Sequence, residues 1–445
     1  MKEGPLQNFS LYRSAVLIMQ RDIFVYILSI VTGVIIARIL GPEILGSWVL
    51  LSIVSAYAEG FGRLKTDIAS VYFLGSKKAD ELEIFFSTTF FAITSGLLIT
   101  GILLWQIDLL ESFLFHNIVG THTEQLYFVI LVIPFEFLLY NYTYFYIALE
   151  KVTLYNRIKV IQAVTNFIMI CGLLFILNLN LWAIVIAKIV SVLGTLLYCI
   201  LAFKKKQVRN LISLWNPLLN MEILRYAFNF YIIGVIGNVN RLTVKTISAS
   251  FFNASNLAFY NQGESSGRFL NVIPNSLATI LYPRISGTED NKQSLEISCQ
   301  AFRLNLVLMS LFGVMLYIFA DPIITMLYGD AFKPTAEVLK LAIPGFVIGS
   351  SALTLKSYFE GKGQASIIAK IQMIPVILQI PLAYYLVARF GLYGAAISLS
   401  IGTAFYGLVV LLAFMWKYKL SIKTIFPNSS DIFVLLSLLR DFYKK

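Results

Sequence analysis

Residues 36–49 read IARILGPEILGSWV and join two long apolar segments of the chain. Gly41 can take the positive φ that ends a helix, because it has no Cβ to clash with the backbone. Pro42 suits the first turn of the next helix, since its missing N–H is not needed there, and Glu43 complements the positive end of that helix. This stretch therefore predicts two apolar helices joined by a tight turn.

A weaker copy of this turn follows 212 residues later, at residues 248–261, SASFFNASNLAFYN. The similarity continues along both halves, because Asp108–Phe115 resembles Asp321–Tyr328 and Asn180–Ala187 resembles Gly391–Ser398. The offset between the halves drifts only from 213 to 210. We interpret this register as two tandem repeats of about 200 residues, a design common among membrane transporters.

The composition indicates a membrane protein. Of the 445 residues, 58% are hydrophobic and only 13% are charged, about half the charged fraction of a soluble protein. The net charge of +11 could suggest nucleic acid, but lysine and arginine gathered in loops on one side of a membrane explain it better, so we expect no nucleic-acid partner. The three cysteines and two histidines have no metal-ligand spacing, and we expect no metal and no cofactor.

Twelve apolar segments are long enough to cross a bilayer, which takes about 20 residues. They are 20–40, 44–62, 84–104, 126–148, 158–178, 181–203, 226–250, 255–282, 300–320, 336–358, 368–388 and 391–415. Because each repeat holds an even number of segments, both repeats enter the membrane from the same side. The predicted fold is an all-α membrane protein of two six-helix bundles, related by an axis along the membrane normal.

The loops predict the orientation and the domains. The side that holds both termini carries 26 of the 35 lysines and arginines and the other side four, so both termini are expected to be cytoplasmic. The expected domains are a bundle at 1–203, a cytoplasmic interfacial linker at 204–225, a second bundle at 226–416 and a cytoplasmic tail at 417–445. Apolar residues at helical spacing in that tail predict an amphipathic surface helix.

Polar residues follow single helical faces inside several of these segments. Gly234, Asn238, Arg241, Lys245 and Ser248 step by four and three along segment 226–250, and similar stripes follow segments 20–40, 44–62 and 255–282. Lipid does not tolerate such faces. We therefore expect these four segments to line a water-filled cavity between the halves.

Charged residues within spanning segments are costly, and they mark function by default. The predicted substrate-binding cations are Arg241, Lys245, Arg268, Arg63, Lys356 and Lys188. The predicted polar or ion-coupling residues of the cavity are Glu59, Glu264, Glu136, Asn238 and Asn271.

A structural alternative exists for most of these charges. Glu264 and Arg268, like Glu59 and Arg63, are four residues apart and could neutralise each other. Lys188 and Lys356 could extend to the membrane interface. By contrast, Arg241 and Lys245 share a face without an acid on their own helix, which favours an anion as ligand.

Three motifs resemble those of bacterial polysaccharide flippases: ARILGPEILGSW at 37–48, LYPRIS at 281–286 and MLYGDAFKPTAEVLKLAIPG at 326–345. The resemblance covers nearly the whole chain and extends to the superfamily of multidrug, oligosaccharidyl-lipid and polysaccharide exporters. It departs at Asn253–Asn256, where the family usually has glycine near the turn.

The resemblance implies two bundles facing each other in a V and working by alternating access in the bacterial inner membrane. The implied substrate is an undecaprenyl-diphosphate-linked oligosaccharide, flipped to the outer leaflet for surface polysaccharide such as O-antigen or lipopolysaccharide. Other polysaccharide-assembly membrane proteins are candidate partners. The resemblance implies a transporter and not an enzyme, and the sequence does not indicate whether H⁺ or Na⁺ drives it.

Three alternatives remain at this point. A drug exporter of the same fold would present acids to organic cations, and a lipid II flippase usually has two more helices than the twelve counted here. A membrane polymerase or ligase of the same sugars would usually need a large outer loop with catalytic groups, whereas the loops here are short.

Overall fold

A computed structural model describes residues 5–76, 79–115, 122–203, 216–287 and 290–426. Within these ranges the regular structure is helical and contains no strand. The chain divides into two compact units, Met1–Asn238 and Val239–Lys445, which are described separately below.

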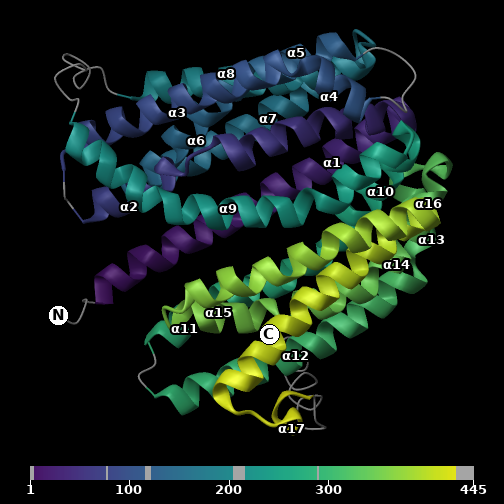
Figure 1. Cartoon of the computed structure of the whole chain (residues 1–445). Coiled ribbons are helices and arrows are strands. Elements are labelled where there is room, and N and C mark those ends of the chain that lie inside the picture. Colours follow the sequence, from purple (N-terminus) through teal and green to yellow (C-terminus); the bar gives the residue numbers. More distant parts are fainter. Residues whose placement is uncertain (1–4, 77–78, 116–121, 204–215, 288–289, 427–445) are drawn as a thin grey trace. The chain divides into compact units, whose positions relative to one another are not determined.

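The N-terminal unit consists of long and short helices, in which α7 lies beside α8 and α3 beside α6 (Figure 1). In order they are α1 (Pro5–Tyr57), a π-helical turn (Ala58–Gly62), α2 (Thr66–Gly75), α3 (Glu81–Trp105), α4 (Ile107–Leu114), α5 (Thr123–Leu131), α6 (Ile133–Ala148), α7 (Val152–Phe175) and α8 (Asn180–Ala202). The first part of α9 (Pro217–Phe251) also belongs to this unit.

The C-terminal unit begins with the last part of α9. It continues with α10 (Ala254–Gly267), a 3-10 turn (Arg268–Asn271), α11 (Val272–Gly287), α12 (Asn291–Ile318), α13 (Ala320–Tyr328), a 3-10 turn (Asp330–Phe332), α14 (Lys333–Ser351), α15 (Leu353–Gly361), α16 (Ala365–Tyr418) and α17 (Ile422–Ile425). A buried apolar cluster of this unit joins α11, α12, α15, α16 and α17 and includes the fully buried Tyr358, Phe359 and Phe414.

Eight helices of the described part of the chain are long and apolar enough to cross a membrane. Two of them, Leu17–Gly62 and Lys370–Tyr418, have 46 and 49 residues, and each is long enough for two crossings. The expected segments 226–250 and 255–282 lie in α9 and in α10 to α11, which carry the polar stripes. The all-α membrane fold expected from the sequence is confirmed.

Glycine and asparagine shape the breaks between these helices. Gly41 has φ 73° and interrupts α1, as its place in the sequence predicts. At the matching place of the second repeat, Asn253 instead caps α10, and its side-chain oxygen accepts a hydrogen bond from the Asn256 N–H at 2.9 Å. A second matched pair, Asn180 (φ 46°) and Gly391 (φ 56°), shares a positive φ at the offset of 211 found in the sequence.

The boundary between the units differs from the expected linker at 204–225. It falls between Asn238 and Val239, inside α9, because the first turns of that helix pack on α2 and α3. Leu219, Ile223 and Ala227 are buried there. Residues 204–215 of the expected linker, and the expected amphipathic tail helix from residue 427 onward, lie outside the described residues.

Candidate functional site

Arg63 is at the centre of an ion-pair network in the N-terminal unit. It follows the π-helical turn Ala58–Gly62, an irregularity that often marks functional sites. Its guanidinium binds Glu59 Oε1 at 3.1 Å and the carboxylate of Asp67, and lies 4.0 Å from the centre of the Tyr140 ring. Because two carboxylates meet one buried guanidinium, the network has no surplus positive charge to offer an anion.

Lys188 and Glu136 form a second ion pair in the same unit. Lys188 Nζ lies 3.0 Å from Glu136 Oε1 and donates a hydrogen bond to Ser55 Oγ at 2.8 Å. These contacts join α8, α6 and α1. Lys188 therefore does not extend to an interface, and its charge is balanced locally.

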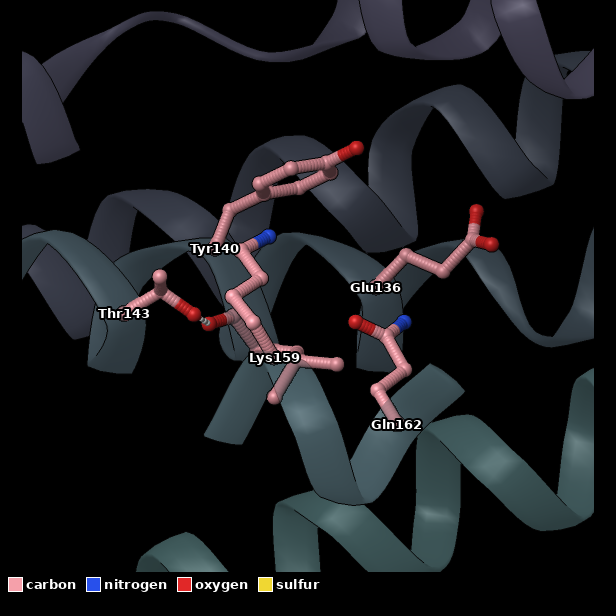
Figure 2. A pocket seen from close by; sticks show the side chains of 6 residues that line it. Glu136, Tyr140, Thr143, Lys159 and Gln162 are labelled. Carbon is pink, nitrogen blue, oxygen red and sulfur yellow. Dashed lines mark hydrogen bonds between the residues drawn. The ribbon is translucent and has the colours of Figure 1, made fainter. Parts of the chain in front are cut away.

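Glu136 and Lys188 line an open cavity of about 530 Å³ whose walls come from α1, α6, α7 and α8. This volume is within the range of about 300–1,000 Å³ that small-molecule sites occupy. A smaller pocket of about 40 Å³ shares three of its lining residues, Glu136, Lys159 and Gln162. Figure 2 shows Lys159 reaching toward the Tyr140 ring in that pocket, with Glu136 and Gln162 beside each other.

The C-terminal unit holds two cations on one carboxylate. Arg268 donates to Glu264 Oε1 from Nε at 3.0 Å and from Nη2 at 2.5 Å. Lys245 Nζ lies 3.4 Å from Glu264 Oε2 and donates to Asn261 Oδ1 at 2.7 Å. The Glu264 side chain is 3% exposed, whereas that of Arg268 is 40% exposed. The group therefore carries one surplus positive charge, and its guanidinium can be reached from outside.

Arg241 lies one helical turn before Lys245 on α9 and is exposed. Both residues belong to the C-terminal unit. The predicted Arg241–Lys245 face therefore lies beside the cluster on Glu264, because Lys245 is a member of that cluster. The acid that neutralises Lys245 comes from α10 and not from α9 itself.

The remaining predicted residues are placed apart from these groups. Lys356 pairs with Glu360 at 3.5 Å along α15. Asn238 donates to the Gly234 carbonyl at 3.1 Å, and Asn271 ends the 3-10 turn half-buried. Within each unit the structure thus brings together Arg63 with Glu59, Lys188 with Glu136, and Lys245 with Glu264 and Arg268, but it does not add Lys356 to any of these groups.

Sequence reasoning missed two residues of these groups, Lys159 and Asp67, and placed Asn261 on a polar stripe without assigning it to the site. A signal for Lys159 was available, because Lys159, Gln162 and Asn166 step by three and four along α7 as a polar stripe. Asp67 is four residues after Arg63, the spacing of a helical ion pair. Asn261 lies on the polar face of α10 that already held Glu264 and Arg268.

The fold, with charged side chains held inside spanning helices, defines a multi-pass all-α membrane protein. The model of a family described as "Polysaccharide biosynthesis protein" matches residues 35–337. The chain belongs to this family.

Solved structures share the fold. A lipid II flippase, MurJ, in an inward closed conformation has a TM-score of 0.74 at 15% identity, covering 92% of this chain and 89% of that one. A multidrug resistance MATE family transporter in an inward-facing conformation has a TM-score of 0.70 at 15% identity, covering 88% and 93%. A putative O-antigen transporter of Shigella flexneri is 23% identical over 156 residues, which span 35% of this chain but only 37% of that protein's length.

Proposed function

We propose that this protein is a flippase that moves an undecaprenyl-diphosphate-linked oligosaccharide repeat unit from the cytoplasmic to the periplasmic leaflet. The flipped unit would serve assembly of a surface polysaccharide such as O-antigen. The observation that carries the proposal is the surplus positive charge of Lys245 and Arg268 on the buried Glu264. Membership in the polysaccharide biosynthesis family supports the substrate class.

The chemistry of the substrate explains why such a cluster is needed. A diphosphate must cross about 30 Å of hydrocarbon with its sugars, and its transfer without compensating charges would be prohibitive. Arg268 offers planar, forked donors that suit phosphate oxygens, and Lys245 adds a point charge. Glu264 orients both cations when no substrate is bound, and its negative charge lowers the free-energy cost of holding them in the membrane.

Arg241 completes the proposed diphosphate site. It lies on the same helix as Lys245 and at the same face, one turn away, so that a diphosphate held by Arg268 and Lys245 could extend to it. We propose that these three residues hold the diphosphate during translocation, and that the protein resides in the inner membrane with both termini in the cytoplasm. It acts as a transporter without catalysing a covalent step.

The test is export of surface polysaccharide in a strain that lacks its own flippase. Arg241→Ala should abolish export at normal protein level, and Arg241→Lys should restore only part of it, because the charge returns without the fork. The double change Arg241→Gln with Lys245→Gln should leave a folded but inactive protein. Arg389→Gln is the matched control, since Arg389 is exposed on α16 and donates to the Tyr385 hydroxyl. Normal export by the folded double variant would contradict the proposal.

A further inference from the structure

The cavity of about 530 Å³ in the N-terminal unit has polar chemistry of its own. All of its lining residues lie between Val25 and Val192, within that unit, and none belongs to the Lys245–Glu264–Arg268 cluster. The α7 stripe of Lys159, Gln162 and Asn166 faces this space. A stripe of polar and charged side chains in an otherwise apolar cavity of a membrane bundle indicates a ligand or a water-filled path.

The charge of this wall is one positive unit. Lys188 is balanced by Glu136 at 3.0 Å, whereas Lys159 has no carboxylate within ion-pair distance among the residues that the structure describes. Its Nζ lies 5.6 Å from the centre of the Tyr140 ring. Two ion pairs, Arg21–Asp22 and Arg63–Glu59, act on it at longer range, and each is balanced within itself. A half-buried ammonium that lacks a carboxylate within a membrane segment favours an anion beside it.

The uncharged groups of the wall suit a hydroxylated ring. Neither Gln162 nor Asn166 makes a side-chain hydrogen bond to any part of the chain that is described, although both are half-buried. Each amide can therefore both donate to and accept from a ligand hydroxyl. Trp48 adds an aromatic surface from α1, the helix that packs beside α7, and the apolar side of a sugar ring can pack against it.

The number of charges separates a carboxylate from a phosphate. One ammonium without a carboxylate partner matches a single negative charge, and the paired Glu136 and Lys188 on the same wall add no positive charge for a second one. A diphosphate, which needs several cations, fits the cluster in the C-terminal unit better. From these observations we infer that the N-terminal cavity binds a sugar residue that carries one carboxylate, of the uronic-acid type, with Lys159 on the carboxylate and Gln162 and Asn166 on the ring hydroxyls.

This inference rests on the proposed function, because the sugar would belong to the transported oligosaccharide. The N-terminal cavity would then be the subsite that recognises an acidic sugar of that oligosaccharide. The subsite predicts selectivity among oligosaccharides that carry the same lipid diphosphate.

Binding of free sugars to the purified full-length protein tests the subsite directly. The probes are glucuronate, glucose, acetate and inorganic phosphate, each measured by saturation-transfer NMR in detergent micelles at low salt. We expect glucuronate to bind at least fivefold more tightly than glucose, with ring protons saturated, and acetate and phosphate to compete poorly. Lys159→Gln should lower the affinity for glucuronate to that for glucose. Lys159→Arg should retain most of the preference for glucuronate over glucose.

Two further variants separate the effect of the Lys159 charge from a general effect of substitution on folding. Lys151→Gln removes an exposed lysine just before α7 and should leave the fivefold preference unchanged. The double change Gln162→Leu with Asn166→Leu should weaken glucose and glucuronate alike, since it removes the amides and keeps the charge. Equal affinity of the native protein for glucuronate and glucose would overturn the inference, as would a preference that survives in Lys159→Gln.

Competition by acetate or phosphate as strong as that by glucuronate would also overturn it, because the site would then recognise charge alone. The outcome is separable from that of the proposed function. A protein that translocates lipid-linked oligosaccharide but shows no glucuronate preference refutes only the subsite. A protein that binds glucuronate through Lys159 but translocates no lipid-linked oligosaccharide refutes only the flippase proposal.

Discussion

Arg268 and Glu264 lie four residues apart and share two hydrogen bonds, 3.0 Å from Nε and 2.5 Å from Nη2, to one carboxylate oxygen. The second oxygen of Glu264 faces Lys245 at 3.4 Å. The helical spacing of the first pair is visible in the sequence, whereas the contact with Lys245 joins two helices. One buried carboxylate thereby fixes two cations, and its removal should have a larger effect than the loss of either cation.

Glu264→Gln should lower the stability of the protein. The change leaves two cations without a carboxylate, and we expect a loss of about 3 kcal/mol, the lower end for a broken buried ion pair, since the Arg268 side chain is 40% exposed. Thermal unfolding in detergent micelles measures it. Glu337→Gln is the control, because that side chain is 50% exposed and pairs at the surface with Lys340. Equal melting temperatures for Glu264→Gln and Glu337→Gln would show that the cluster does not stabilise the fold.

The Glu136–Lys188 pair should show coupling in a double-mutant cycle. Glu136→Gln and Lys188→Gln each leave one half-buried charge without its partner, while the double variant leaves none. We expect the double variant to be more stable than the sum of the single changes predicts, by roughly 0.5–3 kcal/mol. Additive effects on unfolding would mean that the 3.0 Å contact contributes no net stability.

Gly41→Ala should destabilise the turn within α1. Gly41 has φ 73° and ψ 179°, a backbone conformation that essentially only glycine adopts, and forcing an L-residue into it costs about 1–3 kcal/mol. Gly101→Ala is the control, because Gly101 lies within helix α3 and an added Cβ meets no atom within 4 Å. The control should be neutral or slightly more stable when both variants are melted in micelles. A Gly41→Ala variant that melts with the native protein would contradict the role of the positive φ.

The loop charges predict the topology. Reporter fusions at Lys78, Lys206 and Lys445 should score as cytoplasmic, and a fusion near His116 should score as periplasmic, because 26 of the 35 lysines and arginines lie on the first side. A periplasmic score at Lys206 would mean that the first half does not contain an even number of crossings.

The fold could be predicted from the sequence because apolar length and turn residues are local signals. Gly41 marked the break in α1, and the Asn180–Gly391 match revealed the repeat before any contact was known. The unit boundary within α9 could not be predicted in this way, because it depends on which helices the first turns of α9 pack against.

The candidate site was predictable only in part for the same reason. Polar stripes identified Arg241, Lys245 and Arg268, and the i,i+4 spacing identified the pairs with Glu264 and Glu59. The partners of Lys245 and Lys188 come from other helices, and their distances of 3.4 Å and 3.0 Å are properties of tertiary packing. The cavity beside Lys159 likewise depends on tertiary packing, because it forms where α1 meets the later helices α6, α7 and α8.

Translocation by the purified protein tests the central claim most directly. Proteoliposomes would contain a fluorescent undecaprenyl-diphosphate oligosaccharide, and a membrane-impermeant quencher would report the fraction that changes leaflet. We predict translocation by the native protein and by Lys333→Gln, whose lysine is exposed and pairs with Asp330, but a loss of at least tenfold in Arg268→Gln and in Arg241→Gln with Lys245→Gln. Translocation by these folded variants at the native rate, or none by the native protein, would contradict the account.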